Sequence, residues 1–158
     1  MKAGRYFALI TGIAYLLIGL MGFVPSLVSE PTVLPEYVAE VGVRSGFGYL
    51  LGLFPINTAH NIVHLVVGVL GILASIALDS SRLYAGLLGI FYATLAVLGF
   101  IPAAQTMFGL IPIYGNDIWL HAGTAAIAIY FGFFATPNLL QLFAQNRDKA
   151  REEVSEPS

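Results

Sequence analysis

Four long runs of apolar residues alternate with shorter polar segments along this chain. The runs are Tyr6–Val24, Thr58–Leu78, Leu83–Ile101 and Ile118–Thr136, and none of them contains Asp, Glu, Lys or Arg. Each run is close to the roughly 20 residues that a helix needs to cross the hydrocarbon core of a bilayer. The runs do not alternate apolar and polar positions, as the strands of a membrane barrel would. The pattern therefore predicts an all-α polytopic membrane protein with four transmembrane helices.

The composition indicates that lipid is the main solvent of this chain. Of its 158 residues, 58% are hydrophobic and 10% are charged, and the mean hydropathy is +0.82. Soluble domains are about 45–50% apolar and about 25% charged. The absence of cysteine excludes thiolate catalysis and iron–sulfur ligation. The net charge of −2 and the lack of a basic stripe indicate no nucleic-acid partner.

The basic residues fall almost entirely on one side of the predicted topology. With four crossings, both termini share a side with the loop Asp79–Arg82. That side holds Lys2, Arg5, Arg82, Arg147, Lys149 and Arg151, whereas the other side holds only Arg44. Lys and Arg concentrate on the cytoplasmic side of membrane proteins. We therefore expect both termini to be cytoplasmic.

Two segments lie outside the four runs. The first outer loop contains the apolar, glycine-rich stretch Tyr37–Phe54, which predicts a short helix that lies at the membrane interface or dips back into the membrane. The last residues, 144–158, form a charged tail with little apolar surface to bury, so we expect a disordered cytoplasmic end. The four-helix membrane domain is expected to cover residues 1–143.

The chain also contains an internal repeat. Placing the first run over the third at an offset of 77 residues pairs Arg5 with Arg82, Tyr15 with Tyr92, and Pro25 with Pro102. Placing the second run over the fourth at an offset of 57 residues pairs Pro55 with Pro112 and His64 with His121. The pattern predicts two tandem copies of a two-helix unit, about residues 5–78 and 82–136. Because each unit crosses twice, the copies are expected to be parallel.

Four polar side chains near the outer ends of the second and fourth runs are candidates for chemistry. His60 and His64 are four residues apart, and so are Asp117 and His121, so each pair shares a helix face. At the 57-residue offset, His60 corresponds to Asp117. Histidines at this depth are unfavourable against lipid, so we expect them to point into the bundle.

Four roles for these side chains stay open at this point. In the first, they form a hydrogen-bonded network between the repeats. In the second, His60, His64, Asp117 and His121 form a metal site, because histidine is a common ligand of zinc, copper and iron. Alternatively, His64 and His121 ligate a haem or a chlorophyll-type pigment. The last alternative is a role in quinone binding or proton relay. The sequence does not identify the cofactor and predicts no catalytic residue.

The segment from Gly52 to His64, Gly-Leu-Phe-Pro-Ile-Asn-x-x-His-Asn-x-x-His, resembles a bacterial four-helix membrane family known as domain of unknown function 4383. The resemblance covers about Tyr6 to Phe134, and Asp117 to His121 forms its second half-motif. In this second copy Tyr114-Gly115 replaces Asn57-Thr58, so the two half-motifs are not strictly symmetric. The resemblance implies the four-helix membrane fold, located in a bacterial inner (cytoplasmic) membrane or a thylakoid-type membrane, and no particular reaction.

The sequence favours a non-enzymatic membrane protein that acts as an accessory or assembly module. The alternative is a redox or cofactor-binding membrane protein that uses the outer-half histidines. A small-solute transporter is the third hypothesis, and the inner halves of the runs offer few polar residues for it. The expected partners are the lipid bilayer and either other membrane proteins or a second copy of the chain.

Overall fold

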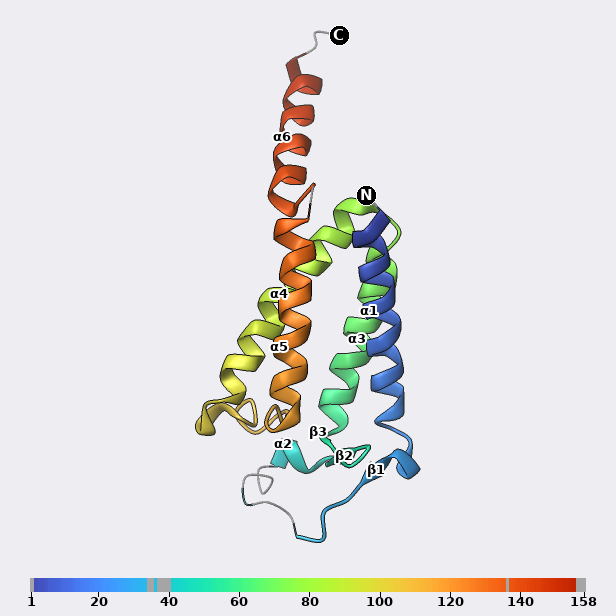
Figure 1. Cartoon of the computed structure of the whole chain (residues 1–158), viewed down its shortest axis with the longest axis vertical. Helices are drawn as coiled ribbons and strands as arrows, with labels where there is room; N and C mark the ends of the chain where they lie inside the picture. Colours follow the sequence, from blue (N-terminus) through green and yellow to red (C-terminus); the bar gives the residue numbers. More distant parts are fainter. Residues whose placement is uncertain (1, 34–35, 37–40, 136, 156–158) are drawn as a thin grey trace.

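A computed structural model describes residues 2–33, 36, 41–135 and 137–155, and most of them are helical. The long helices are α1 (Lys2–Met21), α3 (Thr58–Ala74), α4 (Leu78–Gly99), α5 (Asn116–Ile129) and α6 (Leu139–Ser155). The short helices are η1 (Pro25–Leu27), α2 (Val41–Arg44), η3 (Pro102–Ala104) and the π-helix η4 (Tyr130–Phe134). The strands are β1 (Val28–Ser29), β2 (Gly48–Leu50) and β3 (Phe54–Ile56). Figure 1 shows α1, α3, α4 and α5 running alongside one another, with both chain ends at the same end of the bundle.

Three helical stretches of the described chain are long and apolar enough to cross a membrane. They are Ala3–Met21, Leu78–Gly99 and Asn116–Lys149, and α3 is an apolar helix of 17 residues. Large apolar side chains point outward from these helices, for example Leu87 with 60% and Val97 with 62% of its surface exposed. Such an extensive exposed apolar surface is typical of a protein that contacts lipid.

The bundle consists of two helix pairs, α1 with α3 and α4 with α5, and a glycine allows a close approach in each. A Cβ atom on Gly12 would lie 2.6 Å from the backbone nitrogen of Ile72 in α3. A Cβ atom on Gly89 would lie 2.8 Å from the backbone nitrogen of Ile129 in α5. Neither position has room for a side chain, so the two backbones of each pair pack directly against each other.

The ends of the two pairs that carry Gly22 and Gly99 show a second pair of equivalent positions. Gly22 in the first pair accepts a hydrogen bond of 2.9 Å from the side-chain nitrogen of Asn61. In the second pair, a Cβ atom on Gly99 would lie 2.7 Å from Cγ1 of Ile118. Ile118 therefore stands in place of Asn61, and the carbonyl of Gly99 accepts its hydrogen bond of 3.1 Å from the side-chain nitrogen of Gln105 instead.

Arg82 is buried at the other end of the bundle, although the sequence assigned it to a loop. The segment Asp79–Arg82 forms the first turns of α4, and Arg82 is only 2% exposed. Its Nη1 donates a hydrogen bond to the carbonyl of Phe131 in η4. The guanidinium fills the space next to Gly4, where a Cβ atom would lie 2.9 Å from Nη1. Arg82 therefore joins α1, α4 and η4.

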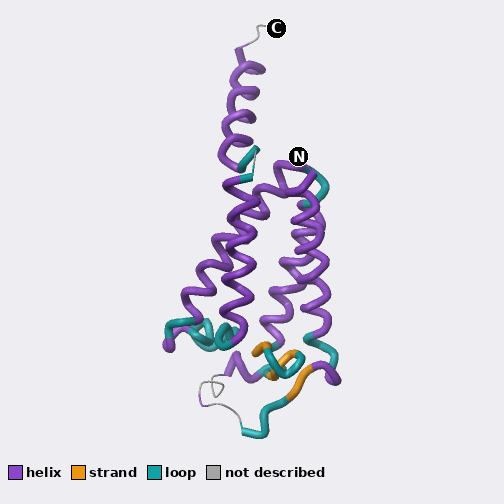
Figure 2. The backbone as a smooth tube through the Cα atoms, viewed as in Figure 1, coloured by secondary structure: helices purple, strands orange, loops and turns teal. Residues whose placement is uncertain are grey.

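A small antiparallel sheet covers the opposite end of the bundle, in the order β1-β2-β3 (Figure 2). It stands where the sequence predicted a single interfacial helix over Tyr37–Phe54. Within the described part of that stretch, only the four residues of α2 are helical. Gly46, with φ +67°, follows α2, and Leu51 and Gly52 have φ of 53° and 72° in the turn between β2 and β3. Positive φ values interrupt a helix, so these residues produce a hairpin. Residues 37–40 lie outside the described residues.

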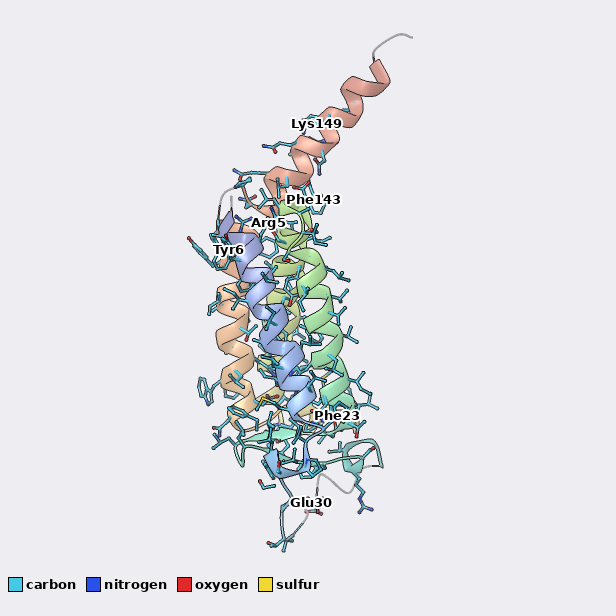
Figure 3. The ribbon with its side chains drawn as sticks, turned by 90° about the vertical axis from the view of Figure 1, so that its right-hand side faces the viewer. Arg5, Tyr6, Phe23, Glu30, Phe143 and Lys149 are labelled. Carbon is cyan, nitrogen blue, oxygen red and sulfur yellow. The ribbon has the colours of Figure 1, made fainter. Side chains whose placement is uncertain are left out.

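The charged tail forms α6, which projects from the bundle beyond Phe143 and carries Lys149 (Figure 3). The sequence predicted disorder for residues 144–158, of which 156–158 lie outside the described residues. A reciprocal cap starts this helix. The backbone nitrogen of Asn138 donates to the side chain of Gln141 at 2.9 Å, and that of Gln141 donates to Asn138 at 3.0 Å.

Candidate functional site

A buried cap residue positions the two histidines of α3. The side-chain oxygen of Asn57 accepts a hydrogen bond of 2.8 Å from the backbone nitrogen of His60, which fixes the first turn of the helix. Its side-chain nitrogen donates to the carbonyl of Leu110 at 2.7 Å and so ties α3 to the segment before α5. His60 and His64 then lie one turn apart, with ring centroids separated by 4.4 Å.

The first turns of α5 supply Asp117 and His121 to the same region. The residue before this helix is Gly115, whose φ of +65° suits glycine and which has no side chain to cap the helix. The arrangement at Asn57 is therefore not repeated here, in line with the asymmetry of the two half-motifs. Asn116 instead donates a hydrogen bond of 3.3 Å to the carbonyl of Leu53 in the hairpin turn. Asp117 lies in the first turn, where the helix dipole favours a carboxylate.

The structure brings together the four side chains that the sequence singled out, and we call them the His–Asp cluster: His60, His64, Asp117 and His121. Oδ2 of Asp117 lies 3.4 Å from Nε2 of His121 and 3.8 Å from Nε2 of His60. Each of the three histidines presents one ring nitrogen, and these atoms all lie within 4.8 Å of one another. All four residues are buried, with exposures of 2–6%.

Several polar atoms of the cluster have no hydrogen-bond partner within the protein. They include Nδ1 of His64, Nδ1 of His121 and Oδ2 of Asp117, all of them buried. The contacts of 3.4 and 3.8 Å between Asp117 and the imidazoles are longer than hydrogen bonds of this type. A buried polar atom without a partner costs about 1–3 kcal/mol. The cluster therefore offers nitrogen and oxygen donors that a ligand would satisfy.

Two tyrosines form the wall of the cluster that faces the bundle interior. The ring of Tyr15 in α1 lies 5.2 Å from that of His64, and the ring of Tyr92 in α4 lies 4.9 Å from that of His121. The hydroxyl of Tyr15 shares a hydrogen bond of 2.9 Å with Thr124. Sequence reasoning did not assign the tyrosines to the site, although their pairing at the 77-residue offset was a signal for them.

The His–Asp cluster separates two cavities. A small cavity of about 30 Å³ is lined by all three histidines together with Tyr92 and apolar side chains. A larger one of about 450 Å³ lies between α1 and α5, and His64, Asp117 and His121 line it. The first is large enough for one water molecule or an ion. The second is within the usual size of a binding pocket for a small organic molecule.

Comparison with known proteins identifies a family. The model of the family described as "Domain of unknown function (DUF4383)" matches residues 5–134, which include most of α1 and the whole His–Asp cluster. No curated protein and no solved structure matches the chain. The match covers most of the sequence and extends through η4, so the chain belongs to the DUF4383 family.

Proposed function

We propose that this protein is a membrane-embedded metal-binding module in which His60, His64 and His121 hold a divalent transition-metal ion beside Asp117. One observation carries the proposal: three buried imidazoles present ring nitrogens within 4.8 Å of one another. Three histidines are a known ligand set for Zn²⁺, and a carboxylate oxygen is a suitable fourth ligand. The four side chains of the His–Asp cluster carry nitrogen and oxygen donors, which suit an ion such as zinc or iron.

A hydrogen-bonded network between the helix pairs is less consistent with the geometry. Such a network would pair its buried members, but Nδ1 of His64, Nδ1 of His121 and Oδ2 of Asp117 are left without partners. An ion between the imidazoles would use nitrogen lone pairs, and its positive charge would balance the buried carboxylate. The described residues that line the two cavities include no lysine or arginine to provide that charge.

Axial ligation of a haem or pigment is also less consistent with the geometry. The cavity that all three imidazoles line has a volume of about 30 Å³ and accommodates an ion or a water molecule. His64 and His121 also line the larger cavity, but a macrocycle there would leave out His60, which does not line it. The geometry therefore favours a bare ion among the cofactors that the histidines suggest.

The membrane topology belongs to the proposal. We place α3 as a fourth span beside the three longer ones, because 17 residues extend about 25 Å and this is the lower limit for a transmembrane helix. The charged residues of α6, such as Lys149, and the N-terminal Arg5 are then cytoplasmic. Glu30 and the small sheet, at the other end of the bundle in Figure 3, are on the outer side. The His–Asp cluster lies near this outer side.

We also propose that the two helix pairs arose by duplication of one unit. Ile72 and Ile129 are 57 residues apart, and Gly12 and Gly89 are 77 residues apart, so the two close glycine contacts are equivalent under the sequence offsets. The contacts of Tyr15 with His64 and of Tyr92 with His121 are equivalent in the same way. A metal ion would then lie between matching elements of the two copies.

Metal analysis of the purified protein tests the proposed function. The protein is prepared without a histidine tag, incubated with Zn²⁺, passed through a desalting column and analysed by mass spectrometry for bound metal. We expect about one zinc ion per chain in the wild type and a loss of at least tenfold in occupancy in His64→Ala and His121→Ala. Asp117→Asn should weaken binding less, because three imidazoles remain.

Asn61→Ala is the matched control for these variants. Asn61 is a buried polar residue of α3 next to His60, but it bonds to Gly22 in α1 rather than to the cluster. This variant should bind zinc as the wild type does, even if its stability falls. A wild-type protein that retains no metal, or histidine variants that retain as much as Asn61→Ala, would contradict the proposal.

A further inference from the structure

The larger cavity is an elongated groove between α1 and α5. On α1 its lining residues recur every three or four positions from Phe7 to Met21, and on α5 they do so from Asp117 to Ile127. This spacing marks one continuous face of each helix. Fourteen residue steps along α1 correspond to about 21 Å, so the groove extends over much of the length of the bundle. The cavity, with a volume of about 450 Å³, is therefore long and narrow rather than spherical, and suits a chain-like ligand.

The polar groups of the groove are concentrated towards its outer end. His64, Asp117 and His121 lie there, close to the hairpin residues Phe54 and Ile56 that also line it. Further along, the only polar lining residues of the described chain are Thr11, Tyr15 and Thr124, and the last two bond to each other. The rest of the lining is apolar. A matching ligand has one polar head and a hydrocarbon tail.

The rim of the groove consists of exposed apolar residues. Ile10 on α1 is 66% exposed, and Ile127 on α5 is 54% exposed. Both lie within stretches that are long and apolar enough to cross a membrane. In the topology proposed above, this rim faces the hydrocarbon core of the bilayer, so the ligand would enter from the lipid.

The charges of the groove limit the head group. No lysine or arginine lines it among the described residues, and Asp117 is its only acidic residue. The phosphate of a phospholipid would meet a carboxylate and no cation, which is unfavourable. A neutral head with carbonyl or hydroxyl oxygens suits the site, because imidazole N–H groups donate to a carbonyl and a carboxylate accepts from a hydroxyl. His64, Asp117 and His121 line the groove, and Nδ1 of both histidines and Oδ2 of Asp117 have no hydrogen-bond partner within the protein.

We propose that this groove binds a lipid-soluble quinone or quinol, with the oxygen-bearing ring at His64, Asp117 and His121 and the tail between α1 and α5. A quinone ring is neutral and has only carbonyl oxygens as strong acceptors, and its reduced form has hydroxyl donors. Both sets match the head site. The proposal rests on the proposed membrane topology for its lipid entrance, but it does not require the metal ion.

Decylubiquinone is the probe for the test. The full-length protein in phosphatidylcholine nanodiscs is titrated with it, and the thermal unfolding midpoint of each sample is measured. We expect the midpoint of the wild type to rise by several degrees with increasing decylubiquinone, because a ligand that binds only the folded state stabilises it. Ala14→Trp should reduce the apparent affinity at least tenfold, because Ala14 lines the groove and a large side chain there fills it.

Ile13→Trp is the matched control, because Ile13 is the neighbouring residue on α1 and lies outside the groove with 44% exposure. It should respond to decylubiquinone as the wild type does. Each variant is compared with its own ligand-free midpoint, so a change in basal stability does not affect the result. An equal response of Ala14→Trp and Ile13→Trp would overturn the proposal. So would an equal effect of dodecanol or of phosphatidylglycerol at the same concentration, because the groove would then accept any lipid.

Measuring zinc in the same samples separates this proposal from the metal site. Ala14→Trp should lose decylubiquinone binding and keep its zinc, because Ala14 does not line the small cavity that all three histidines line. Wild-type protein treated with a chelator should lose its zinc and keep a response to decylubiquinone. A protein that binds zinc but never responds to decylubiquinone would overturn the quinone proposal and leave the metal site intact.

Discussion

The rings of Tyr15 and Tyr92 lie against each other, with centroids 5.2 Å apart, where α1 and α4 meet. Each tyrosine also contacts a histidine of its own helix pair, His64 for Tyr15 and His121 for Tyr92. The contact between the tyrosines therefore connects the two histidine-bearing pairs through the centre of the bundle. Tyr92 is 1% exposed and belongs to the main apolar core. A substitution that changes the contact between the tyrosines should therefore alter the packing of both the candidate site and the core.

Removing the hydroxyl of Tyr15 should destabilise the protein modestly. Tyr15→Phe loses the hydrogen bond of 2.9 Å to Thr124 and leaves the threonine hydroxyl unpaired, at a cost of about 1 kcal/mol. Thr124→Val in the same background removes the unpaired group and should recover part of the loss. Denaturant unfolding in detergent measures both effects. Equal stability of all three proteins would show that the hydrogen bond contributes nothing.

Two histidine substitutions should not be additive. His64→Ala and His121→Ala each remove a buried imidazole and its contact with Tyr15 or Tyr92, and should each cost about 1–3 kcal/mol. The double variant should cost less than their sum, because the two imidazoles line the same two cavities and substitutions of neighbours that share a cavity are not independent. Thr94→Ala, on the exposed face of α4, should be additive with either. Strict additivity of the two histidine variants in thermal unfolding would contradict a shared cluster.

The glycine contacts should tolerate no side chain. Gly12→Ala and Gly89→Ala place a Cβ atom 2.6–2.8 Å from backbone atoms of the partner helix, so each should destabilise the bundle by more than about 1 kcal/mol. Gly123→Ala is the matched control. It lies in α5, and the place that its new methyl group would take has no atom within 4 Å, so it should leave the protein unchanged or stabilise it by up to about 1 kcal/mol. Thermal unfolding of the three variants checks the order.

The proposed topology predicts which ends of the bundle react with an impermeant thiol reagent. The natural chain has no cysteine, so single cysteines report without background. Ser26→Cys, at the end with the small sheet, should be labelled in intact cells. Arg151→Cys, an exposed position of α6, should be labelled only after the membrane is opened. Labelling of Arg151→Cys but not of Ser26→Cys in intact cells would reverse the orientation.

The sequence predicted the members of the candidate site better than its surroundings. The four-residue spacings of His60 with His64 and of Asp117 with His121 put each pair on one helix face, and the cost of exposing histidine to lipid turned both faces inward. Helix periodicity is thus enough to predict which face of a helix a residue occupies, provided that the residue lies within a regular helix. It also identified the apolar helices themselves, since their runs lack charged residues.

The parts that the sequence did not predict depend on backbone conformation and on packing between helices. The turn of the hairpin needs a positive φ at Leu51 as well as at Gly52, and a positive φ is common for glycine but rare for leucine. The buried position of Arg82 depends on the missing side chain of Gly4 and on the carbonyl that η4 presents to it, both distant in sequence. The groove depends on how far α1 and α5 diverge, which no periodicity encodes.

The small sheet has a kinetic consequence for whatever occupies the His–Asp cluster. Ile56 in β3 is 1% exposed and also lines the groove beside Asp117, so the hairpin closes the outer end of the site. A direct path for an ion or a water molecule from the end with the small sheet to the cluster passes this hairpin, whereas the open side of the groove faces lipid in the proposed topology. Under that topology a hydrophilic ion would take the first path, and its exchange should then follow the opening of β2 and β3.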